Sequence, residues 1–530
     1  MGIICGKGGD VNIPNKSIKT KGANSNELEL LNKKEFQKSW EQSHLNLQTE
    51  IAYMWGISIP IKDITQVYIF NKNYIGSGHY GSVRKAKLKI DRGKTYAVKS
   101  VEKKKLKSDM ALLKNELEIL RFSDHPNIVQ FYEIYQDKLS YHFVMELCEG
   151  GDVTSFLEKK GALDEPLAKK IIFQVLMTIN HLHSCGIVHR DIKPDNYLFK
   201  NADPYSPIKL IDFGLSKKYQ IGNKMTSVLG TPYYVAPEII EKRGYTEKCD
   251  IWSAGVMLYL LLVADFPFRG ATHAELFEKI KRGEYSLKAS TQIIALSSEG
   301  KSLLSILLDT DPNKRASASE AMRHSWFDDL NMEINTRGKK HITPQLVERL
   351  RSFKRGSQFS KEVIRLLVMI HEEDPKVTDL KDAFFYLDVL NNGVINKEEL
   401  MKIYLEVGEP HSEHEIEEII KSLQLRTKGV ITYTEFVTAA IDSSFYSADS
   451  CLDEAFIRFD IDQNGMITDK DITDCFSRFG VDIKQHEVLK MIEEFDLQKD
   501  GSISKDEFQT IMKGDFHNHV SPKTNFIKDK

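Results

Sequence analysis

Asp191, Lys193 and Asn196 fall within a six-residue stretch of the segment 189–196, which reads HRDIKPDN. A carboxylate here can accept or orient a hydroxyl proton, an ammonium group can stabilise a phosphoryl group in transfer, and an amide oxygen can bind a metal ion. Asp212, at the start of the sequence DFG, adds a second metal-binding group. Phosphoryl transfer needs mostly positioning and neutralisation of charge, so these residues predict that chemistry, with Asn196 and Asp212 holding Mg²⁺.

A glycine-rich segment and a lysine at the end of a predicted strand indicate a nucleotide site. Residues 76–83 read GSGHYGSV, and their glycines allow the backbone to approach nucleotide phosphates. Alone this pattern is weak, because it also occurs in dinucleotide-binding folds and in turns. Lys99, at the end of YAVK, can neutralise the α- and β-phosphates, and Glu116 is placed to pair with it. The predicted nucleotide-binding residues are Ile75, Gly76, Ser77, Gly78, His79, Tyr80, Gly81, Ser82, Val83, Ala97, Lys99, Met145, Glu146, Cys148, Asp152, Leu198 and Asp212.

Two further residues are expected to support this site without taking part in the chemistry. Asp250 lies in the sequence CDIWSAG and is predicted to brace the catalytic loop. Arg315 is predicted to pair with Glu238, the last residue of the APE sequence.

The C-terminal part of the chain contains a four-fold repeat with a period of 36 residues. In each unit a Gly is followed two residues later by an Ile and six residues later by an acid. This is the pattern of a 12-residue calcium loop, in which Gly makes a sharp turn, the apolar residue pairs with a neighbouring loop and the acid closes the ligand shell. The four glycines are Gly393, Gly429, Gly465 and Gly501, and the four acids are Glu399, Glu435, Asp471 and Glu507.

The last two loops have complete sets of oxygen donors, but the two sets differ. Aspartate at position 12 of the third loop reaches a bidentate pose less easily than glutamate, which lowers calcium affinity or favours Mg²⁺. The fourth loop, closed by a glutamate, is the better calcium site of the two. The predicted ligands are Asp460, Asp462, Asn464, the Met466 carbonyl and Asp471 in the third loop, and Asp496, Gln498, Asp500, the Ser502 carbonyl and Glu507 in the fourth.

The first two loops are poorer. The first offers Asp388, Asn392, the Val394 carbonyl and Glu399, but Leu390 at its position 3 has no donor, so weak calcium binding and an empty loop both remain open. The second has Gln424, Arg426 and Lys428 at its ligand positions, and two cations repel a divalent ion. We expect it to be a structural loop, retained because Ile431 pairs with Ile395.

Between the predicted catalytic domain and the repeats lies a connector rich in Lys, Arg and apolar residues. Residues 337–370 are expected to form a basic amphipathic helix, the kind of target that an opened pair of calcium loops grips by its apolar face. A solvated linker helix is the alternative.

Taken together, these segments predict the α+β fold class, with a two-lobed catalytic domain followed by an all-α domain of four helix-loop-helix units. The predicted divisions are 1–66, an N-terminal extension; 68–327, the catalytic domain; 328–375, the connector; 376–513, the repeats; and 514–530, a tail.

Composition excludes several classes of protein. With 41% hydrophobic and 28% charged residues, the 530-residue chain resembles ordinary globular proteins, and its net charge of −3 gives no reason to expect nucleic acid binding. The six Cys show no CxxC pair, so neither a zinc site nor a disulfide framework is indicated, and a cytoplasmic location is expected. The longest apolar stretch, residues 256–263, is too short to span a membrane.

The N-terminus carries a separate signal. Gly2 after Met1, with Cys5 nearby, predicts myristoylation and palmitoylation and hence membrane association through the N-terminus. Gly6 departs from the Ser or Thr preferred at that position, and an unmodified tip is the alternative.

These motifs, in this order, closely resemble the calcium-dependent protein kinases of plants and protists over residues 68–513. The resemblance implies a serine/threonine kinase that uses ATP, Mg²⁺ and Ca²⁺, and Lys193 and Thr231 fit that type. It implies that the connector, or junction, holds the active site inactive at rest and that calcium makes the EF-hand module grip the junction and relocate. A constitutive kinase with structural EF-hands and a kinase regulated by external calmodulin are the alternatives.

The same resemblance indicates a substrate preference and a modification site. Asp152, Asp195 and Glu278 match positions where related kinases place acids that face basic residues of protein substrates, although ordinary surface carboxylates are an equal alternative. Ser227 lies where related kinases carry an activating phosphate or an acid, and Arg190 could receive that phosphate.

Overall fold

The protein is described by a computed structural model covering residues 63–78, 81–89, 93–106, 110–219, 224–227, 231–287, 291, 295–423, 429–478 and 483–514. Gly2, Cys5, His79, Tyr80, the loop positions Gln424, Arg426 and Lys428, and the tail after residue 514 lie outside these ranges. Within them, no helix combines the length and the apolar character that crossing a membrane requires.

The N-terminal lobe is a five-stranded antiparallel sheet with the order β1-β2-β3-β5-β4 and one long helix, α2 (Met110–Phe122). The sheet begins at Tyr68, as the alternation of apolar residues predicts. In β3, Tyr96, Ala97 and Val98 are buried, and Lys99, which follows them, is partly exposed. The strands are β1 (Tyr68–Gly78), β2 (Gly81–Leu88), β3 (Thr95–Glu102), β4 (Phe131–Gln136) and β5 (Ser140–Met145).

The C-terminal lobe is mainly helical and is built around two central helices. In α4 (Glu165–Ser184) and α6 (Lys248–Val263) most side chains are buried, as expected for helices enclosed by other elements. Two short strand pairs, β6 (Ile187–Val188) with β9 (Lys217–Lys218) and β7 (Tyr197–Phe199) with β8 (Ile208–Leu210), border the catalytic loop. The other helices are α3 (Val153–Lys160), α5 (Pro237–Ile240), α7 (His273–Arg282), α9 (Ser298–Leu307) and α10 (Ala318–Met322).

The connector differs from the single helix predicted for it. It forms three helices, α11 (Asp328–Lys339), α12 (Pro344–Phe353) and α13 (Gln358–Ile370). Thr343 and Ser357 accept hydrogen bonds from the first turns of α12 and α13, and Pro344 occupies the first position of α12. These caps start new helices inside a stretch whose amphipathic pattern is continuous.

The C-terminal module consists of four helix-loop-helix units, as the repeat predicts. Its two loop pairs are joined by short strands, with Ile395 opposite Ile431 and Ile467 opposite Ile503, which confirms the predicted pairing. All four loop glycines have positive φ, between 77° and 91°, which is the conformation that requires glycine. The helices are α14 (Pro375–Leu387), α15 (Lys397–Val407), α16 (Glu413–Leu423), α17 (Tyr433–Ala440), α18 (Ser443–Tyr446), α19 (Asp449–Phe459), α20 (Asp469–Arg478), α21 (Gln485–Phe495) and α22 (Lys505–Gly514), and the strands are β10 (Val394–Ile395), β11 (Ile431–Thr432), β12 (Met466–Ile467) and β13 (Ile503–Ser504).

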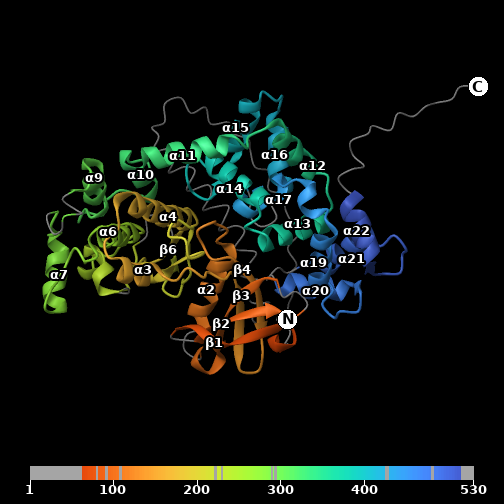
Figure 1. Cartoon of the computed structure of the whole chain (residues 1–530), viewed down its shortest axis with the longest axis horizontal. Coiled ribbons are helices and arrows are strands. Elements are labelled where there is room, and N and C mark those ends of the chain that lie inside the picture. The colour runs from red at the N-terminus through yellow and green to blue at the C-terminus, as the bar shows by residue number, and fades with distance from the viewer. Residues whose placement is uncertain are drawn as a thin grey trace, which may run out of the picture.

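The module encloses the connector. Figure 1 shows α12 and α13 among the module helices, and the ring of Phe359 in α13 lies about 5 Å from those of Phe459 and Phe495, with centroid distances of 5.0 and 4.9 Å. Basic residues of the connector pair with module acids, for example Arg349 with Asp442 at 3.0 Å. The apolar faces of α12 and α13 are therefore buried, so these two helices do not form a solvated linker.

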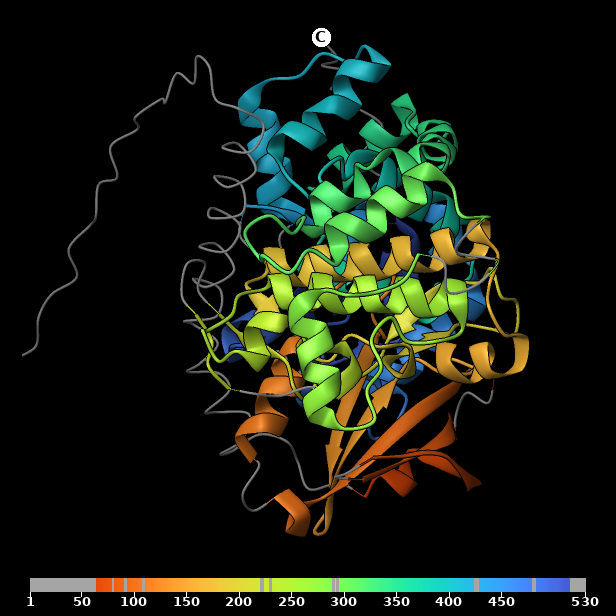
Figure 2. The same cartoon turned by 90° about the vertical axis from the view of Figure 1, so that its left-hand side faces the viewer.

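The module lies along one side of the two-lobed domain. In Figure 1, α19 and α20 lie beside the N-terminal lobe, whereas α11 and α14 lie beside α4 of the C-terminal lobe. Figure 2, the view from the side, shows the green and teal helices of the connector and the first EF-hand pair above the lobes, and the blue helices of the second pair mostly behind them. Both lobes thus contact the C-terminal module.

Candidate active site and calcium sites

The loop between β6 and β7 brings the predicted catalytic residues together. Asn196 donates its side-chain amide to the Asp191 carbonyl at 2.7 Å and to Asp191 Oδ2 at 3.1 Å. Lys193 Nζ lies 2.7 Å from Asp191 Oδ2. The hydroxyl of Thr231 donates to Asp191 Oδ1 at 3.0 Å and accepts from Lys193 Nζ at 3.0 Å. Both carboxylate oxygens of Asp191 thus have partners, and these partners hold the carboxylate beside Lys193.

The two predicted supports of this loop are confirmed. Asp250, which is fully buried, accepts the backbone N–H groups of His189 and Arg190, each at 2.8 Å. These bonds hold Arg190 in a left-handed conformation with φ of 66°, which a non-glycine residue adopts only under constraint. Arg315 makes a two-pronged contact with Glu238 at 2.7 and 3.0 Å.

Lys99 on β3 and Glu116 on α2 form the predicted ion pair, at 2.5 Å. Burial lowers the pKa of Lys99, but the carboxylates of Glu116 and Asp212 outweigh this effect and raise it overall. Lys99 therefore carries its charge at neutral pH, where it can neutralise phosphate oxygens.

The donor set at the cleft fits a magnesium–nucleotide complex. Because Asn196 uses its amide nitrogen on Asp191, its amide oxygen remains for a metal ion. Asp212 Oδ1 accepts the Gly214 N–H at 2.9 Å, which leaves the second oxygen of that carboxylate for the same purpose. Hard oxygen donors of this kind are those that Mg²⁺ prefers.

The described residues of the predicted nucleotide-binding set lie mainly on β1, β2, β3 and β5 and on the bridge between Asp152 and Leu198. Ala97 lies opposite Met145 in the β3–β5 ladder, and Leu198 bridges to Asp152. A Cβ atom on Gly81 would lie 1.9 Å from the Ser100 carbonyl, so only glycine allows β2 and β3 to approach each other there. The flanking positions Gly76, Ser82 and Val83 pair within the β1–β2 hairpin, and Ile75 is half-exposed at its edge.

Two residues of that set use their side chains elsewhere. The Asp152 carboxylate caps α3, accepting the Ser155 N–H at 2.6 Å and its hydroxyl at 2.8 Å. The Glu146 carboxylate points away from the cleft and contacts Lys200 at 2.7 Å and Lys209 at 2.8 Å. Any contact of Glu146 with a nucleotide would come from its main chain. Cys148 is partly buried nearby, and this burial raises the pKa of its thiol to about 12.

The structure describes the surroundings of the predicted modification site Ser227 and the exposure of the predicted substrate-facing residues Asp195 and Glu278. Arg190 Nη1 donates to Ser227 Oγ at 2.9 Å, and the Tyr245 hydroxyl donates to the Ser227 carbonyl at 2.9 Å. The structure therefore brings Arg190 and Ser227 together, and adds Tyr245, which the sequence did not indicate. Asp195 and Glu278 are both exposed.

In the third calcium loop, carboxylate oxygens of Asp460, Asp462 and Asp471 all lie within 4.8 Å of one another. Asp460 also accepts the Gly465 N–H at 2.9 Å, which fixes the sharp turn. Burial raises the pKa of Asp460, and the neighbouring carboxylates of Asp471 and Asp462 raise it further against the effect of the backbone donors. A divalent cation would relieve this repulsion, so the cluster fits calcium or magnesium.

The fourth loop has the same internal turn but more open ligands. Asp496 accepts the Gly501 N–H at 2.8 Å, and Glu507 accepts that of Gln498 at 2.9 Å. The slight burial of Asp496 raises the pKa of its carboxyl, but surrounding backbone N–H groups lower it overall, which keeps the group ionised. Gln498 and Asp500 are exposed and Ser502 is half-exposed, so the loop is accessible from solvent.

The first loop is much more enclosed. Asp388 and Glu399 are only 1% and 6% exposed. The other two predicted ligand positions, Asn392 and Val394, lie between them in the sequence. Asp388 accepts the N–H groups of Asn392 and Gly393 at 2.9 and 2.7 Å. Burial raises the pKa of Glu399 to about 7.

Of the second loop, the structure describes Gly429 onward. In this part Glu435 accepts the Thr432 N–H at 2.9 Å and so caps α17.

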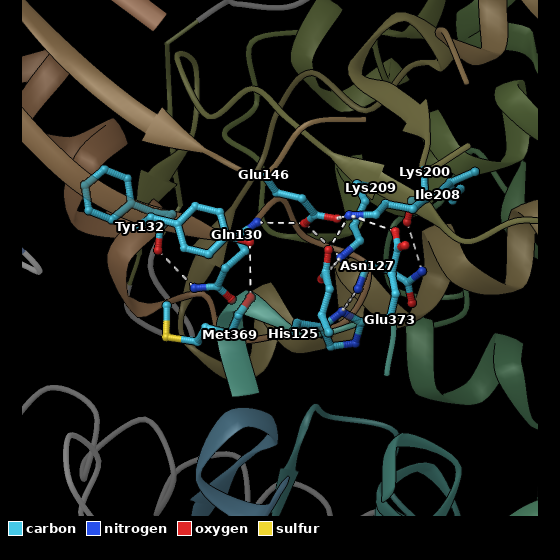
Figure 3. Close-up of polar contacts among 12 residues, drawn as sticks. His125, Asn127, Gln130, Tyr132, Glu146, Lys200, Ile208, Lys209, Met369 and Glu373 are labelled. Carbon is cyan, nitrogen blue, oxygen red and sulfur yellow. Dashed lines mark hydrogen bonds and ion pairs between the residues drawn. The ribbon is translucent and has the colours of Figure 1, made fainter. Parts of the chain in front are cut away.

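A network behind the nucleotide cleft was not predicted. Glu372, which follows α13, contacts Lys200 and also Lys209, the latter at 3.3 Å, and both lysines contact Glu146. Figure 3 shows Lys200 and Lys209 converging on Glu146 of the segment that joins the lobes. Nearby, the Tyr132 hydroxyl donates to the Met369 carbonyl at 3.2 Å. Glu372 is an ordinary acid in a charged stretch, so no local pattern distinguishes it.

Comparison with known proteins agrees with this architecture. The family described as "Protein kinase domain" matches residues 69–327, and "EF-hand domain pair" matches 377–441 and 450–513. The chain is 33% identical to Calcium-dependent protein kinase 5 of Plasmodium falciparum, over 85% of this chain and 79% of the relative. It is 32% identical to Calcium-dependent protein kinase 17 of Arabidopsis thaliana, over 86% and 85%.

Proposed function

This chain belongs to the calcium-dependent protein kinase family, and we propose that it transfers the γ-phosphoryl group of ATP to serine and threonine residues of proteins in response to calcium. One observation carries the proposal. An assembled phosphoryl-transfer site, with Lys99 on Glu116 and Asp191 on Lys193, shares a chain with an EF-hand module that encloses the junction.

The roles of the residues follow from their contacts. Bound MgATP supplies the phosphoryl group and the counter-charge for its transfer. Asp191 orients the acceptor hydroxyl and takes its proton, and Thr231 and Lys193 hold that carboxylate in place. Lys193 also faces the phosphoryl group in transfer, and Lys99 holds the nucleotide phosphates.

We propose that calcium acts through the junction. The buried state of α12 and α13 supports a model in which the calcium-loaded module grips these helices and keeps them away from the catalytic cleft. At rest, the junction would hold the active site inactive. The apolar face of α13 is covered by Phe459 and Phe495, so external calmodulin would have to displace the module to reach it. This arrangement favours the intramolecular sensor over the calmodulin-regulated alternative.

Three further parts of the proposal concern partners and location. Exposed Asp195 and Glu278 favour protein substrates with basic residues near the phosphorylated site. Phosphorylation of Ser227, beside Arg190, would add a charge-assisted contact in the activation segment. Acylation of Gly2 and Cys5 would attach an otherwise cytoplasmic enzyme to membranes.

The test compares phosphorylation of a basic serine peptide by the full chain in calcium and in EGTA, at constant Mg²⁺. We expect calcium to raise the rate, and Asp496→Asn or Asp460→Asn to reduce that increase by removing a ligand charge. Lys499→Asn is a matched control, because Lys499 is an exposed residue of the same loop that is not at a ligand position. Equal rates in both buffers would refute calcium regulation, and a response that needs added calmodulin would favour the alternative.

A further inference from the structure

The first pair of EF-hand loops packs into the catalytic domain. Val394 in β10 and Val430, the residue before β11, are 1% and 8% exposed and belong to the hydrophobic core of the catalytic domain instead of the core of the module. Gly393 lies so close to that domain that a Cβ atom there would be 2.4 Å from His181 Nδ1 and 2.9 Å from His125 Cδ2. This pair therefore makes an apolar contact of its own.

The tip of the first loop is held by two side chains of α4. Asn180 Nδ2 donates to the carbonyls of Leu390 at 2.9 Å and Asn391 at 2.6 Å. His181 Nδ1 donates to the Asn392 carbonyl at 3.0 Å. Three successive carbonyls of the loop are thus used by the catalytic domain, and the leucine at ligand position 3 provides one of them through its main chain.

The second unit is held by Asp124, in the segment between α2 and β4. Its carboxylate accepts the Thr432 hydroxyl at 2.6 Å, the Thr434 N–H at 3.0 Å and the Thr434 hydroxyl at 2.6 Å. An acid of the catalytic domain therefore caps the first turn of α17, a helix of the EF-hand module. Charge-assisted bonds of this kind are about twice as strong as neutral ones.

The second pair of loops presents no comparable contact. A Cβ atom on Gly465 or Gly501 would meet no atom within 4 Å among the described residues. The ligand residues Asp462 and Asp500 are exposed. The loops of the two pairs thus have different surroundings. The loops of the first pair face the catalytic domain, whereas the turns and the ligand residues Asp462 and Asp500 of the second pair face solvent, although α19 of that pair contacts the catalytic domain through Arg458.

We propose that the first pair of EF-hand loops is a docking surface for the catalytic domain and not a calcium sensor, so that calcium is sensed by the second pair alone. The docking surface consists of Leu390–Asn392, Val394 and Val430, and Thr432 with Thr434. Its partner on the catalytic domain consists of Asp124, His125, Asn180 and His181. This inference rests on the proposed function only in that calcium promotes the docked arrangement. It explains why the first loop lacks a ligand at position 3 and yet is retained.

Hydrogen–deuterium exchange of the full chain tests the docking directly. In calcium we expect Asp124→Asn to increase exchange in residues 386–396 and 429–436 by about tenfold, the effect of losing hydrogen bonds to a partly buried charge. Asp203→Asn is the control, because Asp203 is an exposed acid that accepts a backbone N–H in a loop of the C-terminal lobe. Unchanged exchange in Asp124→Asn would overturn the proposal.

A double-mutant cycle keeps the test independent of folding defects. Thr434→Val removes one hydroxyl, and we expect Asp124→Asn combined with Thr434→Val to exchange no faster than Asp124→Asn alone, because the two changes remove the same contact. Fully additive effects would contradict a direct contact.

Calcium titration by calorimetry tests which pair of EF-hand loops binds calcium. We expect two calcium ions per chain, one fewer in Asp460→Asn and an unchanged number in Asp388→Asn. Three ions in the wild type, with one lost in Asp388→Asn, would overturn the proposal. If instead docking and stoichiometry are as expected but the kinase rate does not respond to calcium, the proposed calcium regulation fails and the docking surface stands.

Discussion

Arg458 in α19 donates a hydrogen bond of 2.7 Å to the hydroxyl of Tyr96, which lies on β3 three residues before Lys99. The guanidinium is largely buried and also contacts Glu454 at 3.0 Å. Burial raises the pKa of Tyr96 to about 12, so its hydroxyl remains neutral and accepts this bond. The third EF-hand is therefore joined to the strand that carries the nucleotide-binding lysine.

Tyr96→Phe tests this connection with the loss of one oxygen atom. We expect calcium-stimulated activity to fall several-fold and half-maximal activation to need more calcium, because a hydrogen bond to a charged group contributes about 1.5–3 kcal/mol. The measurement is the peptide phosphorylation rate as a function of free calcium. Tyr74→Phe is the control, since Tyr74 lies in the same sheet and is 64% exposed. Equal behaviour of the two variants would show that the Arg458 contact is energetically unimportant.

Glu372→Gln tests the network behind the cleft. Removing its charge leaves Lys200 and Lys209 with Glu146 as their shared partner, and breaking a partly buried charge pair costs up to about 3–5 kcal/mol. We expect at least about tenfold lower activity at limiting calcium, because a difference of about 1.4 kcal/mol changes an equilibrium constant tenfold. Glu373→Gln provides a neighbouring control, because its side chain is 77% exposed and lies 3.7 Å from Lys200, beyond hydrogen-bond distance. A larger loss in Glu373→Gln than in Glu372→Gln would contradict the assignment.

Thr231→Val tests the support of the catalytic carboxylate. The change removes the hydroxyl between Asp191 and Lys193 while keeping the shape of the side chain. We expect kcat to fall about tenfold or more, with the KM for ATP little changed, because the lost contact orients the base and does not bind nucleotide. Thr231→Ser restores the hydroxyl and is expected to recover most of the rate. An equal loss in both variants would point to a packing role.

Lys381→Met tests the electrostatics of the contact between α14 and α4. Burial lowers the pKa of Lys381 to about 8, and Lys209 adds to this effect. Because the pKa is depressed on folding, burial of the charged lysine destabilises the protein fully below about pH 8, and this penalty fades as pH rises toward the ordinary lysine value of about 10.5. We therefore expect Lys381→Met to raise the unfolding midpoint in urea at pH 7, with a smaller increase at pH 9.5. An increase that grows with pH would contradict the sign of the shift.

Much of the catalytic site could be predicted because its residues occur in short motifs whose residue types fit defined roles in phosphoryl transfer. The predicted contacts of Lys99 with Glu116, Asp250 with the catalytic loop, and Arg315 with Glu238 are all present. These partners lie 17, 61 and 77 residues apart, so the motif in which each residue occurs, and not its local spacing, predicted the contact. The pairing of Ile395 with Ile431 also followed from the repeat.

The connector shows where sequence patterns were insufficient. Its basic and apolar residues predicted one amphipathic helix, whereas Thr343 and Ser357 divide the stretch into separate helices. The periodic pattern indicates correctly that the helices have an apolar side. Helix ends, however, depend on individual capping hydrogen bonds, which a continuous pattern does not reveal.

By itself the sequence determined the α+β class, the order of a phosphoryl-transfer domain and four EF-hand units, and the unequal ligand sets of those units. The tertiary structure alone decided how these parts meet. Asp124 and Thr434 are 310 positions apart, and Lys209 and Glu372 are 163 apart. Such residues are common surface types whose partners are chosen by how whole domains pack, so no local spacing identifies them before the fold brings them together.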